Sequence, residues 1–81
     1  ALGPDHRAVA ATLHNMARLR ADRGEIDEAD RLWARAADIA DRSMAPDAPT
    51  RLTILRSWSR ALEAAGRPER AAEACARAGG A

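Results

Sequence analysis

Apolar residues recur every three or four positions along most of this chain, which is the period of an amphipathic helix. Four segments show the pattern: 5–23, a second that begins near Asp27 and runs to about Ala40, 49–65 and 68–78. Gly24 and Gly66 end the first and third segments, and glycine readily takes the positive φ that closes a helix. β-branched residues are few and never alternate with polar ones, so strands are not expected. The pattern predicts an all-α chain of four helices, arranged as two tandem helical hairpins.

The apolar stripes of these helices predict the core. The residues of these stripes are Val9, Leu13 and Met16 in the first helix, with Arg20 on the same face and Ala17 beside them, Ala29, Leu32, Trp33, Ala36, Ala37 and Ala40 in the second, Leu52, Leu55, Trp58 and Leu62 in the third, and Ala71, Ala74, Cys75 and Ala78 in the fourth. Trp33 and Trp58 stand at core spacing and are expected to pack. Cys75 is expected to be a small buried hydrophobe rather than a reactive thiol.

Local signals predict where the helices begin. Asp27 is a candidate N-cap of the second helix, and Pro49 and Pro68 suit the first turns of the third and fourth. Oppositely charged residues four positions apart form weak pairs on the wet face of a helix. The pairs expected on the second helix are Asp27–Arg31 and Asp38–Arg42.

The chain resembles itself at an offset of 42 residues. The Pro-Asp dipeptide at residues 4–5 returns at 46–47, and further identities mark turns and helix positions: Leu13 with Leu55, Arg18 with Arg60, Gly24 with Gly66, Ala29 with Ala71, and 34–36 with 76–78. A fixed offset of this length is typical of helical repeats. We expect one domain over residues 1–81, with repeat one at about 3–42 and repeat two at about 45–78.

Each hairpin resembles a tetratricopeptide repeat, whose pattern is large-x2-large-small-x2-large, a Gly turn, and then Ala-x3-aromatic. The matching residues are Leu13, Met16, Ala17, Arg20, Gly24, Ala29 and Trp33 in the first hairpin, and Leu55, Trp58, Ser59, Leu62, Gly66, Ala71 and Cys75 in the second. The period resembles that of the longer repeats in kinesin light chains and in bacterial nucleotide-binding signalling ATPases. The resemblance implies a fragment of a right-handed α-solenoid that serves as a protein–protein interaction scaffold.

The resemblance also implies a concave groove lined by the first helix of each hairpin. The residues that it places there are His14, Asn15 and Arg18, and their counterparts Arg56, Ser57 and Arg60. Arginine offers a two-pronged fork to carboxylates, so an acidic peptide or a C-terminal carboxylate is the expected ligand. The alternative is a solvated face on which Arg18 pairs with Asp22 and Arg60 with Glu63. Because each hairpin buries its stripe only against a neighbour, exposed repeat ends predict homo-oligomers or a loosened last helix.

Composition narrows the possible roles. The net charge of +1 at pH 7 argues against a nucleic-acid binder, and no apolar run is long enough for a membrane span. Cys75 is the only cysteine, so no intramolecular disulfide forms and a cytoplasmic location is expected. The chain starts at Ala1 and ends in "AGGA", which favours a piece cut from a longer polypeptide. The resemblance implies that this polypeptide is a bacterial regulatory protein.

No residues assemble into a catalytic or cofactor site. His6 and His14 lack the cysteine or carboxylate partners of a metal site, and no nucleophile triad or phosphate-binding glycine loop is present. The sequence therefore predicts a non-enzymatic protein-interaction module without a cofactor. A structural spacer or self-association segment without a peptide ligand is the alternative.

Overall fold

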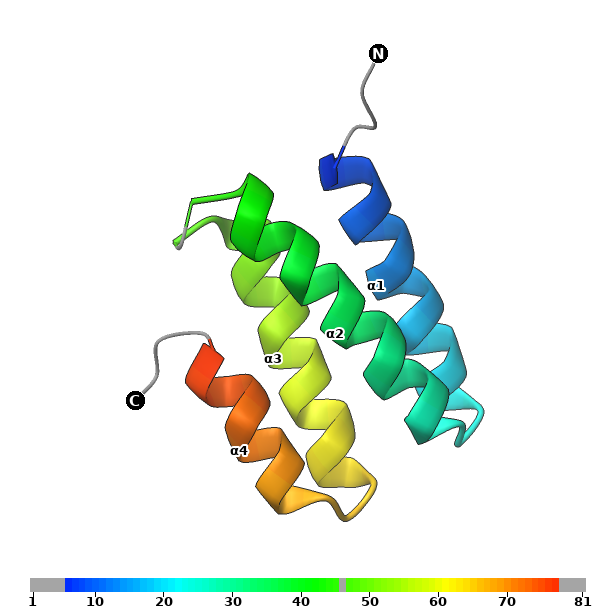
Figure 1. Cartoon of the computed structure of the whole chain (residues 1–81). Helices are drawn as coiled ribbons and strands as arrows, with labels where there is room; N and C mark the ends of the chain where they lie inside the picture. Colours follow the sequence, from blue (N-terminus) through cyan, green and yellow to red (C-terminus); the bar gives the residue numbers. More distant parts are fainter. Residues whose placement is uncertain (1–5, 46, 78–81) are drawn as a thin grey trace.

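The computed structural model describes residues 6–45 and 47–77, which form four helices and, within that part of the chain, no strand. The helices are α1 (His6–Asp22), α2 (Ile26–Ser43), α3 (Pro49–Ala64) and α4 (Pro68–Arg77). Figure 1 shows α2 between α1 and α3, with α4 beside α3. The all-α prediction of two tandem hairpins is confirmed. None of the helices in the described part is long and apolar enough to cross a membrane.

Two glycine turns close the hairpins in the same way. Gly24 and Gly66 have φ angles of 81° and 79°, as the sequence predicts. After each glycine the next amide donates back to the helix: Glu25 N–H to the Arg20 carbonyl at 2.9 Å, and Arg67 N–H to the Leu62 carbonyl at 2.8 Å. These bonds satisfy carbonyls that a helix end leaves unpaired. The two turns are thus the same motif, 42 residues apart.

The helix starts are partly as predicted. Pro49 and Pro68 begin α3 and α4. The prediction of Asp27 as an N-cap is wrong, because α2 begins at Ile26 and Glu25 takes the cap position without a side-chain bond. Asp27 instead lies in the first turn of α2, where its carboxylate pairs with Arg67. An acidic residue in this turn still interacts favourably with the helix dipole.

The core contains more alanine than any other residue. Its buried members are Ala10, Leu13 and Ala17 of α1, Ala29, Trp33, Ala36, Ala37, Ile39 and Ala40 of α2, Ile54, Leu55, Trp58 and Leu62 of α3, and Ala71 and Ala74 of α4. Both predicted tryptophans are buried. Leu32 packs on the cluster only in part, and Leu52 is half-buried. Ala78 lies outside the described residues.

Three predicted core residues are exposed. Val9 and Met16 are 38% and 44% exposed, because α1 buries only the side that faces α2. Cys75 is exposed as well, so its interpretation as a buried hydrophobe is wrong. On α4, only Ala71 and Ala74 are buried in the core, and Cys75 borders an open hollow beside α3 instead.

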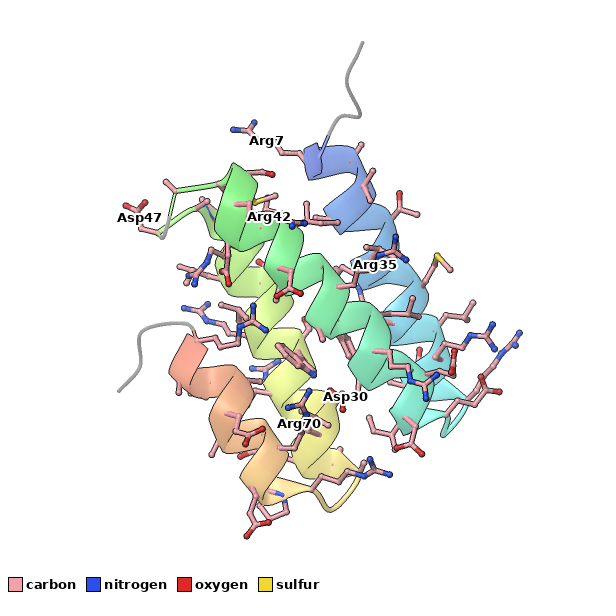
Figure 2. All side chains as sticks on the ribbon, viewed as in Figure 1. Arg7, Asp30, Arg35, Arg42, Asp47 and Arg70 are labelled. Carbon is pink, nitrogen blue, oxygen red and sulfur yellow. The ribbon has the colours of Figure 1, made fainter. Side chains whose placement is uncertain are left out.

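Two arginines of α4 and Arg67, which directly precedes it, pair with aspartates of α2 in a set of ion pairs that we call the Asp–Arg ladder. The Cα atoms of α2 and α4 stay more than 8 Å apart, so only side chains bridge them. The ladder consists of Asp27–Arg67, Asp30–Arg70, Asp38–Arg77 and Asp41–Arg77. Figure 2 shows Asp30 and Arg70 meeting between the two helices. Of the aspartates expected to pair within α2, Asp27 thus pairs with Arg67 before α4 and Asp38 with Arg77 of α4, and Arg31 pairs with Glu28.

Candidate peptide-binding groove

A hollow of about 250 Å³ lies between α1 and α3. We call it the groove. It is lined by Arg18, Ala21 and Asp22 of α1, Trp33 of α2, and Ser57, Arg60 and Ala61 of α3. The two helices run side by side here with few close backbone approaches, so side chains border an open space between them. The first helices of the two hairpins therefore do share a surface, as the family resemblance implies.

Arg18 and Arg60 are brought together at this groove. Both side chains are exposed, and they occupy the same position in the two hairpins. The alternative pairs, Arg18–Asp22 and Arg60–Glu63, are not among the ion pairs of the described residues. Asp22 nevertheless lines the same hollow and reduces its positive charge. The two guanidinium groups are thus placed where they could bind an anion that enters the groove.

His14 is half-buried and holds a core residue in place. Its Nδ1 accepts a hydrogen bond from the indole Nε1–H of Trp33 at 2.9 Å, and the two rings are tilted by 52°. An accepting Nδ1 requires neutral imidazole, with the proton on Nε2. Burial lowers the pKa of His14 below its usual value, and the charge of Arg18 lowers it further. His14 therefore fixes Trp33 in the groove wall.

This bond predicts a pH dependence of stability. The pKa of His14 is depressed in the fold, so the unfolded chain binds more protons as the pH falls through 6.5. We expect full stability above this pH and a falling urea midpoint between pH 7 and pH 5.5. His14→Gln keeps an oxygen acceptor for the indole and removes the titration, so its midpoint should change less over this range. An equal slope in both proteins would show that His14 is not responsible.

Of the remaining predicted site residues, only Ser57 lies at the groove. Ser57 is half-buried and lines the groove with Arg60, whereas Asn15 is exposed on α1 and is not among the lining residues. Arg56 lines a different hollow of about 190 Å³, which we call the end hollow. The end hollow is formed by Leu55, Arg56, Ser59, Arg60 and Cys75. Three of the six predicted residues therefore share the groove, and His14 supports its wall.

Sequence reasoning missed an apolar extension of the groove. A third hollow, of about 470 Å³, is lined by Ala21, Asp22, Gly24, Ile26, Ala61, Ala64 and Ala65. It shares Ala21, Asp22 and Ala61 with the groove, so the two are continuous. The available signal was the row of small residues at positions 61, 64 and 65, three and four apart on α3. Small side chains there leave room between α1 and α3.

Nowhere in residues 6–45 and 47–77 do three His, Cys, Asp or Glu side chains come close enough together to hold a metal ion.

A family model described as tetratricopeptide repeat matches residues 8–78. The chain belongs to the tetratricopeptide repeat family. In terms of this family, α1 and α3 are the first helices of the two repeats, and α2 and α4 are the second. No curated protein and no solved structure matches the chain. Tetratricopeptide repeats serve as protein-interaction scaffolds, and stacked helical pairs of this kind present extended concave surfaces.

Proposed function

We propose that this tetratricopeptide module binds an extended peptide in the groove, with an acidic side chain or a C-terminal carboxylate between Arg18 and Arg60. The observation that supports this most is the position of both arginines on one hollow. Each occupies the same place in successive repeats, so a ligand lying across α1 and α3 meets one after the other. Arginine binds carboxylates through paired N–H groups, which gives direction as well as charge.

The apolar extension adds a second requirement for the ligand. It is lined mainly by alanines and Ile26, beside the charged part of the groove. An aliphatic side chain next to the acidic residue would be removed from water there, which favours binding by about 25 cal/mol per Å². Because the arginines are exposed and Asp22 lies beside them, we expect salt-sensitive binding in the micromolar range, roughly −8 kcal/mol.

The expected result of charge reversal is loss of peptide binding. Acidic peptides with and without a neighbouring leucine are titrated against the parent chain and Arg18→Glu/Arg60→Glu, at low and moderate salt. The double variant should bind at least about tenfold more weakly, since it replaces two attractions by two repulsions. Arg35→Glu/Arg42→Glu is a matched control, because these exposed arginines lie on α2 (Figure 2). Equal losses in both double variants, or none in the first, would contradict the groove assignment.

We further propose that the module acts without catalysis, in the bacterial cytoplasm, as part of a larger regulatory protein. The single cysteine and the resemblance to repeats of bacterial signalling ATPases support this setting.

A second candidate function is association between copies of the chain. The exposed apolar residues Val9, Met16 and Leu19 on α1 favour it.

A further inference from the structure

The contact between α3 and the first hairpin, which we call the internal joint, shows how a further α1 could pack against an exposed end of the molecule. α3 lies against α2, and Trp58 donates its indole N–H to Asp30 of α2 at 2.8 Å. The position 42 residues earlier is Met16, which is exposed on α1. Val9 and Leu19 are the other exposed large apolar residues of the described chain, and they also lie on α1. At the 42-residue offset, Val9, Met16 and Leu19 correspond to Arg51, Trp58 and Ala61 of α3. α1 therefore presents the same positions that α3 uses at the internal joint.

The end hollow presents the other half of that joint. Its residues Leu55, Arg56, Ser59, Arg60 and Cys75 correspond, one for one, to Leu13, His14, Ala17, Arg18 and Trp33 of the first hairpin. In the first hairpin Leu13, Ala17 and Trp33 are buried, and Arg18 and Trp33 line the groove opposite α3. The same positions in the second hairpin border an open hollow beside α3 and α4.

The two ends also complement each other in size. At the internal joint the large Trp33 and the small Ala61 line one hollow from opposite sides. At the ends of the molecule the corresponding positions hold the small Cys75 and the large Leu19. Leu19 of a second copy would therefore enter the space that Cys75 leaves. The large residue thus lies on the first hairpin at the internal joint and on α1 of the incoming copy at the proposed joint.

The hydrogen-bonded pair of the internal joint is replaced at the two ends by a pair of apolar residues. Trp58 and Asp30, which form a hydrogen bond, correspond to Met16 and Ala72. Both members become apolar together, so the joint between copies needs no counterpart of this hydrogen bond. We propose that two copies of this chain join head to tail, with α1 of one copy seated on α3 and α4 of the next. Sedimentation measures this joint without a ligand, so its test can fail or succeed separately from the proposed peptide binding, although Arg60 borders both the end hollow and the groove.

The charges make this joint weak and give it a characteristic salt dependence. The ladder pair Arg67–Asp27 corresponds to Glu25 and Glu69, which carry the same charge. Glu25 pairs with Arg20 of its own copy at 2.7 Å, so the repulsion from Glu69 of the other copy is partly offset, but it replaces an attraction that Asp27 and Arg67 provide within the chain. Salt screens such repulsion, so association should become tighter as salt is added. Contact between different surfaces also leaves one free half-joint at each end, so short chains of copies are expected.

The first experiment exchanges the sizes at the joint. Sedimentation equilibrium of the 81-residue chain should show association that depends on concentration. Cys75→Trp fills the end hollow, and Leu19→Ala removes the side chain that enters it, so each should weaken association, the former about tenfold. The double variant recreates the Trp–Ala combination of the internal joint and should associate better than either single variant. A strictly monomeric parent chain, or a double variant no better than the singles, would overturn the proposal.

The second experiment separates head-to-tail joining from contact between two α1 stripes. Met16→Glu damages only the α1 surface, and Cys75→Trp damages only the end hollow. Each variant alone should associate more weakly than the parent chain, but a mixture should recover dimers, because each supplies the intact half that the other lacks. If Met16→Glu alone is monomeric while Cys75→Trp associates normally, the α1 stripes pair with each other and the proposal is wrong. Circular dichroism of each variant verifies that these exposed positions leave the helices intact.

The third experiment tests the repulsion between the acidic residues. Glu69→Arg places a positive charge opposite Glu25 of the next copy, so association should tighten several-fold and lose its enhancement by salt. Asp47→Arg makes the same change of charge in the exposed linker between α2 and α3 and serves as the control. Weaker association of Glu69→Arg than of the control would contradict the assigned register.

Discussion

Replacement of Trp33 by alanine is expected to abolish cooperative thermal unfolding of this chain. Trp33 is 1% exposed and is among the few large side chains of a core otherwise rich in alanine. Removing a buried aromatic side chain of this size costs about 3–5 kcal/mol. Folded proteins as a class have only about 5–15 kcal/mol of stability, and a chain with so small a core belongs at the low end.

The measurement is the thermal unfolding curve followed by circular dichroism at 222 nm. The parent should give a single sigmoidal transition, and Trp33→Ala a broad, non-cooperative decline. Met16→Ala is the control, because it truncates another large residue on the exposed side of α1 and should shift the midpoint by only a few degrees. If Trp33→Ala melts within a few degrees of the parent, its burial contributes far less to stability than the packing implies.

The sequence predicts well those features that depend on neighbours along the chain. Gly24 and Gly66 were identifiable because a helix that ends in a left-handed residue strongly favours glycine. Pro49 and Pro68 were identifiable as starts because proline lacks only an amide that the first turn does not use. The spacing of the second helix likewise identified Trp33. Each of these signals is complete within one or two helical turns.

The sequence did not predict which side of each helix a neighbouring helix covers. Met16 and Leu13 both belong to the apolar stripe of α1, but α2 covers only Leu13. The sequence shows that a stripe exists and does not show which of its edges is covered. The burial of Cys75 was predicted wrongly for the same reason, since α4 buries Ala71 and Ala74 while Cys75 borders an open hollow that no further helix of the described chain covers.

The candidate site shows the same division. The 42-residue offset was sufficient to place Arg18 and Arg60 on one surface. It could not show that His14 is held by Trp33, because that contact joins α1 to α2 within one hairpin. The apolar extension was equally hidden, since it exists only where the small residues of α3 face those of α1. The ladder pairs join residues some forty positions apart, beyond the reach of any i,i+4 rule.

Replacement of Asp30 by alanine is expected to loosen α4 and to destabilise the chain by about 1–3 kcal/mol. Asp30 accepts the indole N–H of Trp58 at 2.8 Å and pairs with Arg70 at 3.1 Å. The guanidinium groups of Arg70 and Arg77 also lie 5.5 Å from the centre of the Trp58 ring. Alanine at position 30 leaves a buried indole donor unpaired and frees Arg70 from the position that it holds over the ring.

Comparison with Asp27→Ala isolates the effect of burial. Both aspartates pair with an arginine of the second hairpin, but the Asp27 side chain is 76% exposed and that of Asp30 only 19%. An exposed ion pair contributes at most about 1 kcal/mol, so Asp27→Ala should lower the urea midpoint slightly and Asp30→Ala clearly more. Asp30→Asn keeps an oxygen acceptor for the indole and loses the charge, so it should fall between them. Amide exchange over residues 68–77 should quicken most in Asp30→Ala. Equal midpoints for the two alanine variants would show that the Trp58 bond adds nothing, and that α4 is held by surface charge and its two buried alanines alone.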